Sequence, residues 1–359
     1  MVPEARVALI GAGSIAGAYL DSLQATPGFT LVAIASRDGA SAARLAAANG
    51  LRASGVADAL AARDIDYVLN LTPADEHVAI TRASLQAGKS VYSEKPLARD
   101  LAEADALIAL AKRQGVLLAC APATFLWPPL TTVRRLVQEG SLGVVSGALA
   151  TLVYPGPEIF HPNPGHLYAV GPLFDMGVYQ VTALIDLLGP VVAVSAMASR
   201  RSTERRILVG ARAGEPFDVV APTSIHAQLR HAGGAISTLI VSFDGVSALP
   251  PTLTLWGDKA GVTLDPHAPD AVLTISEAIG TRRSLALDGP AWTPARWAIG
   301  ASSAWRSFHT GDAVAASAER ARHVLAVLLA IECASEKGRT IAPDESATQF
   351  RSGAGDRSC

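Results

Sequence analysis

The 359-residue chain contains only three cysteines, and its acidic and basic residues nearly balance, with a formal net charge of −2. Cys120, Cys333 and Cys359 follow no metal-binding or redox spacing, so we expect no cysteine-based site. Sparse cysteine is typical of a reducing compartment, and we expect a cytoplasmic protein. A general nucleic-acid-binding protein would usually be basic, so the charge balance argues against nucleic acid as a partner.

Other signatures are missing as well. No window holds 18 uninterrupted apolar residues, so no membrane-spanning helix is expected. The stretch "MVPEARVALIGAG" passes directly into a strand pattern, without the features of a targeting signal. No G-x-S-x-G turn marks a serine nucleophile. His161 and His166 have no carboxylate ligands at metal-site spacing, and we predict no metal site.

The first pattern that is present is a glycine-rich turn after a short apolar strand. In "GAGSIAGAYLDSL", Gly11, Gly13 and Ala16 fill the positions of G-x-G-x-x-G/A. Gly11 permits a tight turn, Gly13 lets the backbone approach a pyrophosphate, and Ala16 lets the following helix pack closely. The free N–H groups of that helix favour a phosphate. The predicted cofactor-binding loop is Gly11, Gly13, Ser14, Ile15 and Ala16.

The end of the second strand, "TLVAIASRD", lies about 25 residues past Gly11, where this fingerprint places the residue that reads the ribose. An NAD enzyme usually has Asp or Glu there, whereas this chain has Ser36 and Arg37. A carboxylate repels a 2′-phosphate, but a hydroxyl and a guanidinium bind it. We therefore favour NADP(H). NAD(H) is the alternative if Arg37 only opens the next helix at the surface.

Strand and helix patterns alternate at the spacing of a parallel, doubly wound α/β sheet, and then the period changes. A Pro/Gly-rich loop over 155–171 precedes a long helix at 171–189 and several strand-like runs. We predict a dinucleotide-binding domain over 1–122, an α+β domain with a large, mostly antiparallel open sheet over 123–350, and a disordered tail at 351–359. A large exposed sheet favours self-association, so we expect a homodimer or homotetramer.

Lys95 is the first candidate for chemistry. In "VYSEKPLARD" it lies between a carboxylate and a proline, at the carboxyl edge of a buried strand. Proline restricts the preceding residue, and this edge is where open α/β sheets bind ligands. The loop "NLTP" lies at the same kind of edge. Its residues Asn70, Thr72 and Pro73 either face the cofactor or form the N-terminal cap of the next helix.

Asp175 and Tyr179 stand four apart in the expected long helix, so they share one face of it. A lysine, a tyrosine and a carboxylate can together exchange the hydroxyl proton that hydride transfer requires. The alternatives are structural. Asp175 near a helix start can serve the helix dipole, and Tyr179 can be a core residue with its hydroxyl at the rim.

Together, "GAGSIA", "NLTP" followed by His77, "SEKPLA" and "GPLFDMGVYQVTALIDLLG" resemble the Gfo/Idh/MocA oxidoreductases over nearly the whole chain. The resemblance implies a Rossmann domain, a catalytic lysine at Lys95 and a Lys95–Pro96 bond that is often cis. It places Asp175 and Tyr179 on the D-x-G-x-H motif, with tyrosine in place of the histidine. Tyrosine takes the proton-transfer role in the glucose-fructose oxidoreductase and dihydrodiol dehydrogenase branches. On this resemblance, His77 and Glu94 join the cofactor-binding candidates.

The segment "EIFHPNPGHLY" resembles the substrate loop of a sugar-acting subgroup, which makes His161, Asn163 and His166 candidate contacts for a polyol. Phe125 either forms part of the pocket floor or packs between domains. The expected activity is hydride transfer between nicotinamide and a carbinol or carbonyl of a sugar, cyclitol or related small molecule. The alternatives are a cofactor-binding regulator without turnover, and a lyase or isomerase that retains its cofactor.

Overall fold

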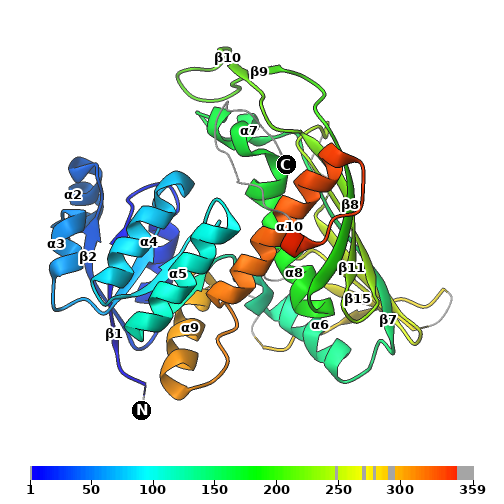
Figure 1. Cartoon of the computed structure of the whole chain (residues 1–359), viewed down its shortest axis with the longest axis horizontal. Helices are drawn as coiled ribbons and strands as arrows, with labels where there is room; N and C mark the ends of the chain where they lie inside the picture. Colours follow the sequence, from blue (N-terminus) through cyan, green and yellow to red (C-terminus); the bar gives the residue numbers. More distant parts are fainter. Residues whose placement is uncertain (1, 247–249, 269–271, 278–279, 290–295, 346–359) are drawn as a thin grey trace. The chain divides into compact units, whose positions relative to one another are not determined.

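The computed structural model describes residues 2–246, 250–268, 272–277, 280–289 and 296–345, so the expected tail at 351–359 lies outside the described residues. The chain divides into two compact units, each described here by itself (Figure 1). Unit 1 is formed from residues 1–126 and 292–325, and unit 2 from 127–291 and 326–359. Residues 292–325 thus group with unit 1, whereas the sequence analysis placed them in the second domain, 123–350. The reason is a β-bridge from Ser317 to Ala119 at the edge of the first sheet.

Unit 1 contains a six-stranded sheet in the order β3-β2-β1-β4-β5-β6, in which every pair is parallel. Its strands are β1 (Ala5–Ile10), β2 (Phe29–Ala35), β3 (Arg52–Ser54), β4 (Tyr67–Asn70), β5 (Ser90–Ser93) and β6 (Leu118–Cys120). The central strands are buried apolar runs because helices cover both faces of a parallel sheet. This confirms the predicted doubly wound domain.

The helices of unit 1 connect these strands and pack around the sheet (Figure 1). They are α1 (Ala16–Gln24), α2 (Gly39–Ala48), α3 (Val56–Ala61), α4 (His77–Gln86), α5 (Leu101–Gln114) and α9 (Ile299–Thr310), with the 3₁₀ turns η1 (Ala74–Glu76) and η2 (Thr124–Leu126). The strand order reverses between β1 and β4. The loops that leave these two strands therefore lie at the switch point where doubly wound sheets bind ligands.

Unit 2 contains an eight-stranded sheet in the order β16-β15-β14-β13-β7-β12-β11-β8, antiparallel except for the pair β7–β12. Its strands are β7 (Val145–Val153), β8 (Val191–Ser199), β11 (Ser224–His231), β12 (Ile236–Ser242), β13 (Thr252–Gly257), β14 (Gly261–Leu264), β15 (Leu273–Ser276) and β16 (Arg283–Leu285). A separate hairpin joins β9 (Glu204–Arg206) to β10 (Pro216–Asp218). The large, mostly antiparallel sheet was predicted correctly.

The helices of unit 2 differ from the prediction in one region. They are α6 (Pro128–Gln138), α7 (Gly165–Pro172), the π-helical turn η4 (Leu173–Gly177), α8 (Val178–Leu188) and, shared with unit 1, α10 (Ala318–Lys337), followed by η6 (Pro343–Glu345). Part of the expected loop is thus helix α7, and the expected single helix is a π-turn followed by α8. Gly171, near the end of α7, interrupts the helical backbone with φ +75°, and a Cβ there would lie 2.9 Å from Ala221 Cβ and Pro222 O.

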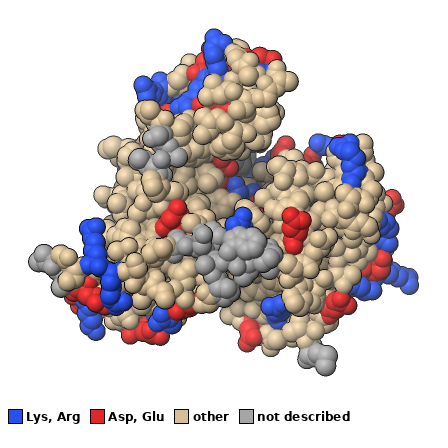
Figure 2. Space-filling model, turned by 180° about the vertical axis from the view of Figure 1, so that it is seen from behind, with Lys and Arg blue, Asp and Glu red and all other residues tan. Residues whose placement is uncertain are grey.

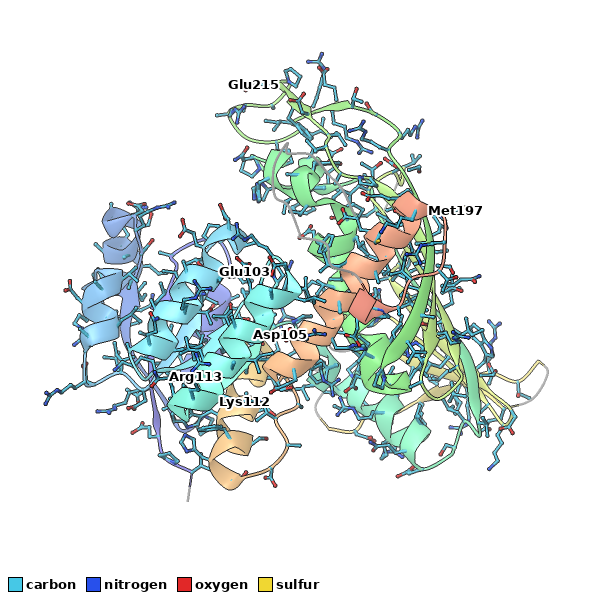
Figure 3. All side chains as sticks on the ribbon, in the orientation of Figure 1. Glu103, Asp105, Lys112, Arg113, Met197 and Glu215 are labelled. Carbon is cyan, nitrogen blue, oxygen red and sulfur yellow. The ribbon has the colours of Figure 1, made fainter. Side chains whose placement is uncertain are left out.

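One face of the large sheet carries exposed apolar side chains. On β8, β12 and β13, buried residues alternate with exposed ones, among them Met197 (80% exposed), Ile236 (51%) and Trp256 (43%). The helices of this unit lie along the other side of the sheet (Figure 1), and Figure 3 labels Met197 on β8. By contrast, the labelled residues of α5 (Figure 3) are charges of both signs, as expected for a solvated helix face.

His231 makes the stability of unit 2 sensitive to acid. Its ring is buried, with Nδ1 2.8 Å from Gly189 O and Nε2 2.9 Å from Ser237 Oγ. Burial lowers the pKa of His231, although the hydrogen bond to Gly189 raises it in part. The folded state therefore binds the proton less readily than the unfolded state. The free energy of unfolding is therefore undiminished by His231 above about pH 6.5, and it declines as the pH falls from there through the folded-state pKa.

We expect His231→Gln to lower the Tm at pH 8 by about 2–4 °C for each kcal/mol of unfolding free energy lost with its hydrogen bonds. The fall in Tm between pH 7 and pH 5 should also be shallower than in the wild type. The exposed His226→Gln on the same strand is the matched control. A pH profile as steep as that of the wild type would contradict the role of His231.

Candidate functional site

The glycine-rich turn has the geometry of a phosphate-binding loop. Gly11 has φ +114°, and a Cβ there would lie 2.5 Å from Leu71 O, so only glycine fits. Gly13 is exposed, and a Cβ there would meet nothing within 4 Å. Ile15, the first boundary residue of α1, makes no side-chain cap. Among the described residues, no carbonyl accepts a backbone bond from the N–H of Ala12, Gly13 or Ser14. The helix start is therefore open to an anion.

The loop after β4 is held from inside by Asn70. Its amide donates to His77 O and to Thr81 Oγ1, each at 3.0 Å, and its Oδ1 accepts from the hydroxyl of Thr72 at 2.7 Å. Asn70 is 0% exposed. Asn70 therefore shapes the loop from inside, and the half-buried Thr72 and exposed Pro73 form its outer surface. The contact of Asn70 with the cofactor stays a prediction.

The E-K-P turn follows β5 directly, and its Lys95–Pro96 bond is cis, as the family resemblance implied. Glu94 N donates to Asn70 O at 2.9 Å, which ties this turn to the neighbouring loop. The Glu94 carboxylate accepts from Tyr19 Oη at 2.7 Å and from Lys95 N at 3.1 Å. The Glu94 carboxylate is therefore turned toward α1, and the residue is half-buried. Its contact with the cofactor stays a prediction. Lys95 is half-buried at the carboxyl edge of the sheet.

His77 begins α4 and is also turned inward. Its Nδ1 lies 2.8 Å from Pro96 O and its Nε2 2.8 Å from Thr72 O, and the residue is 1% exposed. Both ring nitrogens thus contact backbone oxygens of the protein. The contact of His77 with the cofactor stays a prediction.

Ser36 and Arg37 follow β2 at the same sheet edge. The Arg37 side chain is 86% exposed, and its guanidinium lies 2.8 Å from Glu76 Oε1 in η1. Asp38, the next residue, accepts from Ala40 N and from Ser41, and so caps α2. An exposed ion pair such as Arg37–Glu76 contributes only about 0–1 kcal/mol, so it does not prevent Arg37 from binding another anion.

In unit 2, Asp175 lies in the π-turn and Tyr179 in the first turn of α8, both half-buried. π-turns inside helices occur frequently at functional sites. Burial raises the pKa of Tyr154, and the charges of Asp175 and Glu158 raise it further. Burial lowers the pKa of His161, as does the neighbouring His166, while Asp175 acts in the opposite direction. The Asp175 charge therefore acts on both Tyr154 and the expected substrate loop.

The substrate loop itself is ordered by several polar contacts. The rings of His161 and His166 lie 5.0 Å apart, and Asn163 N donates to His161 Nδ1 at 3.0 Å. Its buried Glu158 accepts from Arg205 at 2.7 Å and from Tyr168 Oη, and Arg205 also binds Asp244. This buried ion network connects the substrate loop, which carries His161 and His166, to the β9 hairpin.

Sequence reasoning missed three residues, His267 and Tyr154 in unit 2 and Tyr19, beside Glu94, in unit 1. The ring of Tyr179 lies 5.5 Å from that of His267, whose Nε2 is 3.3 Å from Gln180 Nε2. Burial lowers the pKa of His267, while Asp265 raises it in part. Tyr154 and Tyr19 are the other two. No motif marks any of them, since they reach the site only through the fold.

Phe125, the last candidate, is buried, with the Arg320 guanidinium 4.7 Å from its ring centre. This favours packing over contact with a substrate. Within the described ranges, no three His, Cys, Asp or Glu side chains are grouped to hold a metal ion. The helices described also include none long and apolar enough to cross a membrane. On the face shown in Figure 2, acidic and basic side chains are intermixed rather than gathered into one basic surface.

Comparison with known proteins identifies the family. A model described as an oxidoreductase family with an NAD-binding Rossmann fold matches residues 5–121, and the GFO/IDH/MocA C-terminal domain matches 130–263. The chain is 33% identical over 213 residues to dTDP-3,4-didehydro-2,6-dideoxy-alpha-D-glucose 3-reductase of Streptomyces antibioticus, covering 58% of this chain and 64% of that protein.

The same enzyme of Streptomyces violaceoruber is 30% identical over 289 residues, 78% of this chain and 80% of that protein. Levoglucosan dehydrogenase in complex with NADH shares the fold, with a TM-score of 0.83 at 21% identity, over 94% of this chain and 98% of that one. The chain belongs to the Gfo/Idh/MocA family of oxidoreductases, with its NAD-binding Rossmann domain first.

Proposed function

We propose that the protein is an NAD(P)-dependent oxidoreductase acting on a carbinol or carbonyl of a sugar, cyclitol or related small molecule, with Lys95, Asp175 and Tyr179 as its catalytic residues. One observation supports this most directly. The open glycine loop, the N-L-T-P loop and the E-K-P turn are linked at one sheet edge by the bonds Leu71 N to Ile10 O and Glu94 N to Asn70 O. Lys95 therefore belongs to the cofactor end of unit 1.

A bound nicotinamide cofactor would supply or accept the hydride, and the loop from Gly11 to Ala16 would hold its pyrophosphate. Lys95 would donate a hydrogen bond to the reacting oxygen and stabilise negative charge that develops on it. Tyr179 would give or take the hydroxyl proton, and Asp175 would orient the reacting groups. His161, Asn163 and His166 would bind other hydroxyls, because imidazoles and amides can donate and accept. A cytoplasmic location remains a prediction from cysteine usage.

A test of this function follows the nicotinamide absorbance with NADP(H) and NAD(H) over a panel of sugars, cyclitols and their keto forms. We expect turnover with at least one pair, and cofactor released at each cycle. Tight cofactor binding without turnover would instead indicate a regulatory protein. Product formation without cofactor release would indicate a lyase or isomerase that retains its cofactor.

We infer that the preferred cofactor is NADP(H), bound at its 2′-phosphate by Ser36 and Arg37. Arg37→Ala should weaken NADPH binding by about 10- to 100-fold, the value of a charge-assisted hydrogen bond, and leave NADH binding unchanged. Titration calorimetry with both cofactors measures this. Arg44→Ala, on the neighbouring α2, is the control. Equal affinity of the wild type for the two cofactors would exclude the preference.

The exposed face of the large sheet is proposed to bind a second copy of the chain, giving a homodimer or homotetramer. Trp256 lies against Gly147, where a Cβ would be 2.5 Å from the ring, and Ile236 pairs with Gly147 from the other side. This row is flat and apolar, which suits a self-complementary contact. Ile236→Asp should lower the molar mass in light scattering, whereas the exposed Leu208→Asp, outside the sheet, should not. A monomeric wild type would contradict the proposal.

A further inference from the structure

The E-K-P turn is held from two sides by buried side chains. From α1, Tyr19 Oη donates to Glu94 Oε1 at 2.7 Å, and Tyr19 is 2% exposed. From α4, the His77 ring lies with Nδ1 2.8 Å from Pro96 O. The two contacts fall on the residues immediately before and after Lys95.

Each contact restricts the backbone at Lys95. Glu94 Oε2 accepts from Lys95 N at 3.1 Å, so the hydrogen bond from Tyr19 fixes the carboxylate that holds this N–H. The His77 ring lies with Nδ1 2.8 Å from Pro96 O and Nε2 2.8 Å from Thr72 O. A carbonyl oxygen can only accept, so a protonated ring nitrogen donates to one of these loops, and a ring with two N–H groups donates to both.

Both side chains are buried and have contacts within unit 1. Both polar atoms of the His77 ring contact protein oxygens, and the Tyr19 hydroxyl has Glu94 as its acceptor. An unpaired buried polar group would be costly, so both contacts are retained in the folded protein. Their targets are nonetheless the two neighbours of the one lysine at the sheet edge.

We propose that Tyr19 and His77 are positioning residues that hold Lys95 in its reactive orientation. This rests on the proposed function of Lys95. Tyr19 lies in the first turn of α1, directly after the glycine loop, so it also connects the orientation of Lys95 to the helix that receives the phosphates. A displacement of about 1 Å at a catalytic group can reduce the rate roughly 10²-fold.

The first test measures the turn itself, without activity. Hydrogen–deuterium exchange of peptides covering 90–98 should be about tenfold faster or more in Tyr19→Phe and in His77→Gln than in the wild type. Tyr168→Phe is the matched control, because it removes another buried tyrosine hydroxyl, bound to Glu158, in unit 2. Unchanged exchange at 90–98 in both variants would overturn the proposal, whatever the enzyme's substrate.

The second test is a double-mutant cycle with Lys95→Met. In the wild-type background, Tyr19→Phe and His77→Gln should lower kcat about 10- to 100-fold, with the Kd of the cofactor changed less than about threefold. In the Lys95→Met background they should have no further effect on kcat. Equal losses in both backgrounds would mean a general structural role and overturn the proposal. Full turnover of Lys95→Met alone would instead refute the proposed function, and the exchange data would still decide whether the turn is held.

Discussion

Lys95→Met is expected to lower kcat by about 10²- to 10⁴-fold, the range that a positioned proton-transfer or charge-stabilising group contributes. Methionine keeps the length of the side chain but removes the ammonium group. Lys95 is half-buried and lies two residues past Ser93, the last residue of β5, so the substitution should leave the sheet intact. The Kd of the cofactor should change less than about threefold, because phosphate binding is assigned to the glycine loop.

The measurement needs a substrate from the panel above, with kcat and cofactor Kd determined on the same preparation. Lys112→Met is the control, since Lys112 is exposed on α5 and pairs with Glu319. Loss of cofactor binding together with turnover would place Lys95 in cofactor binding rather than in chemistry. Unchanged turnover would remove Lys95 from the mechanism.

Gly11→Ala and Gly13→Ala are expected to act in different ways although the two residues are neighbours in one loop. At Gly11 an alanine would need φ +114° and would press on Leu71 O, so the apo protein should lose roughly 1–3 kcal/mol of stability. At Gly13 a methyl group enters open space, so the apo Tm should stay within about 1 °C. That space is where a pyrophosphate would approach, and cofactor affinity should fall at least about tenfold.

Thermal unfolding of the apo proteins and cofactor titration separate these two effects. Gly17→Ala is the matched control for Gly13→Ala, because a Cβ there also meets nothing within 4 Å but lies inside α1, beyond the loop. Wild-type cofactor affinity in Gly13→Ala would show that the pyrophosphate lies elsewhere. An unchanged apo Tm in Gly11→Ala would show that the contact with Leu71 can relax.

Sequence patterns predicted the structure correctly where the residues that determine it are adjacent in the sequence. The glycine spacing, the strand before it and the helix after it lie within one short segment, and the structure places an open loop there. The place of Lys95 at the sheet edge was predicted for the same reason, since the proline beside it and the buried strand before it are adjacent in sequence. The alternation of strand and helix likewise predicted the parallel sheet, because its period is a local property.

Side-chain direction could not be predicted in the same way. Asn70, His77 and Glu94 lie at the expected edge, but the partners of their side chains were not predicted, and the partner of Glu94, Tyr19, lies 75 residues away in the sequence. The kink at Gly171, at the start of the expected long helix, lies where its backbone passes close to Ala221 and Pro222, which the sequence does not reveal. His267 reaches Tyr179 only because the strands of the second sheet bring its segment there.

The bridge from Ser317 to Ala119, together with the bond from Cys120 N to Ala316 O, has a consequence for biosynthesis. β6 is the last strand of the first sheet, and its outer edge is completed by residues made long afterwards. During translation this edge stays unpaired while most of unit 2 is synthesised. An unpaired strand edge is a template for aggregation, so a nascent chain stalled before residue 316 would depend on chaperones in a way that the finished protein does not.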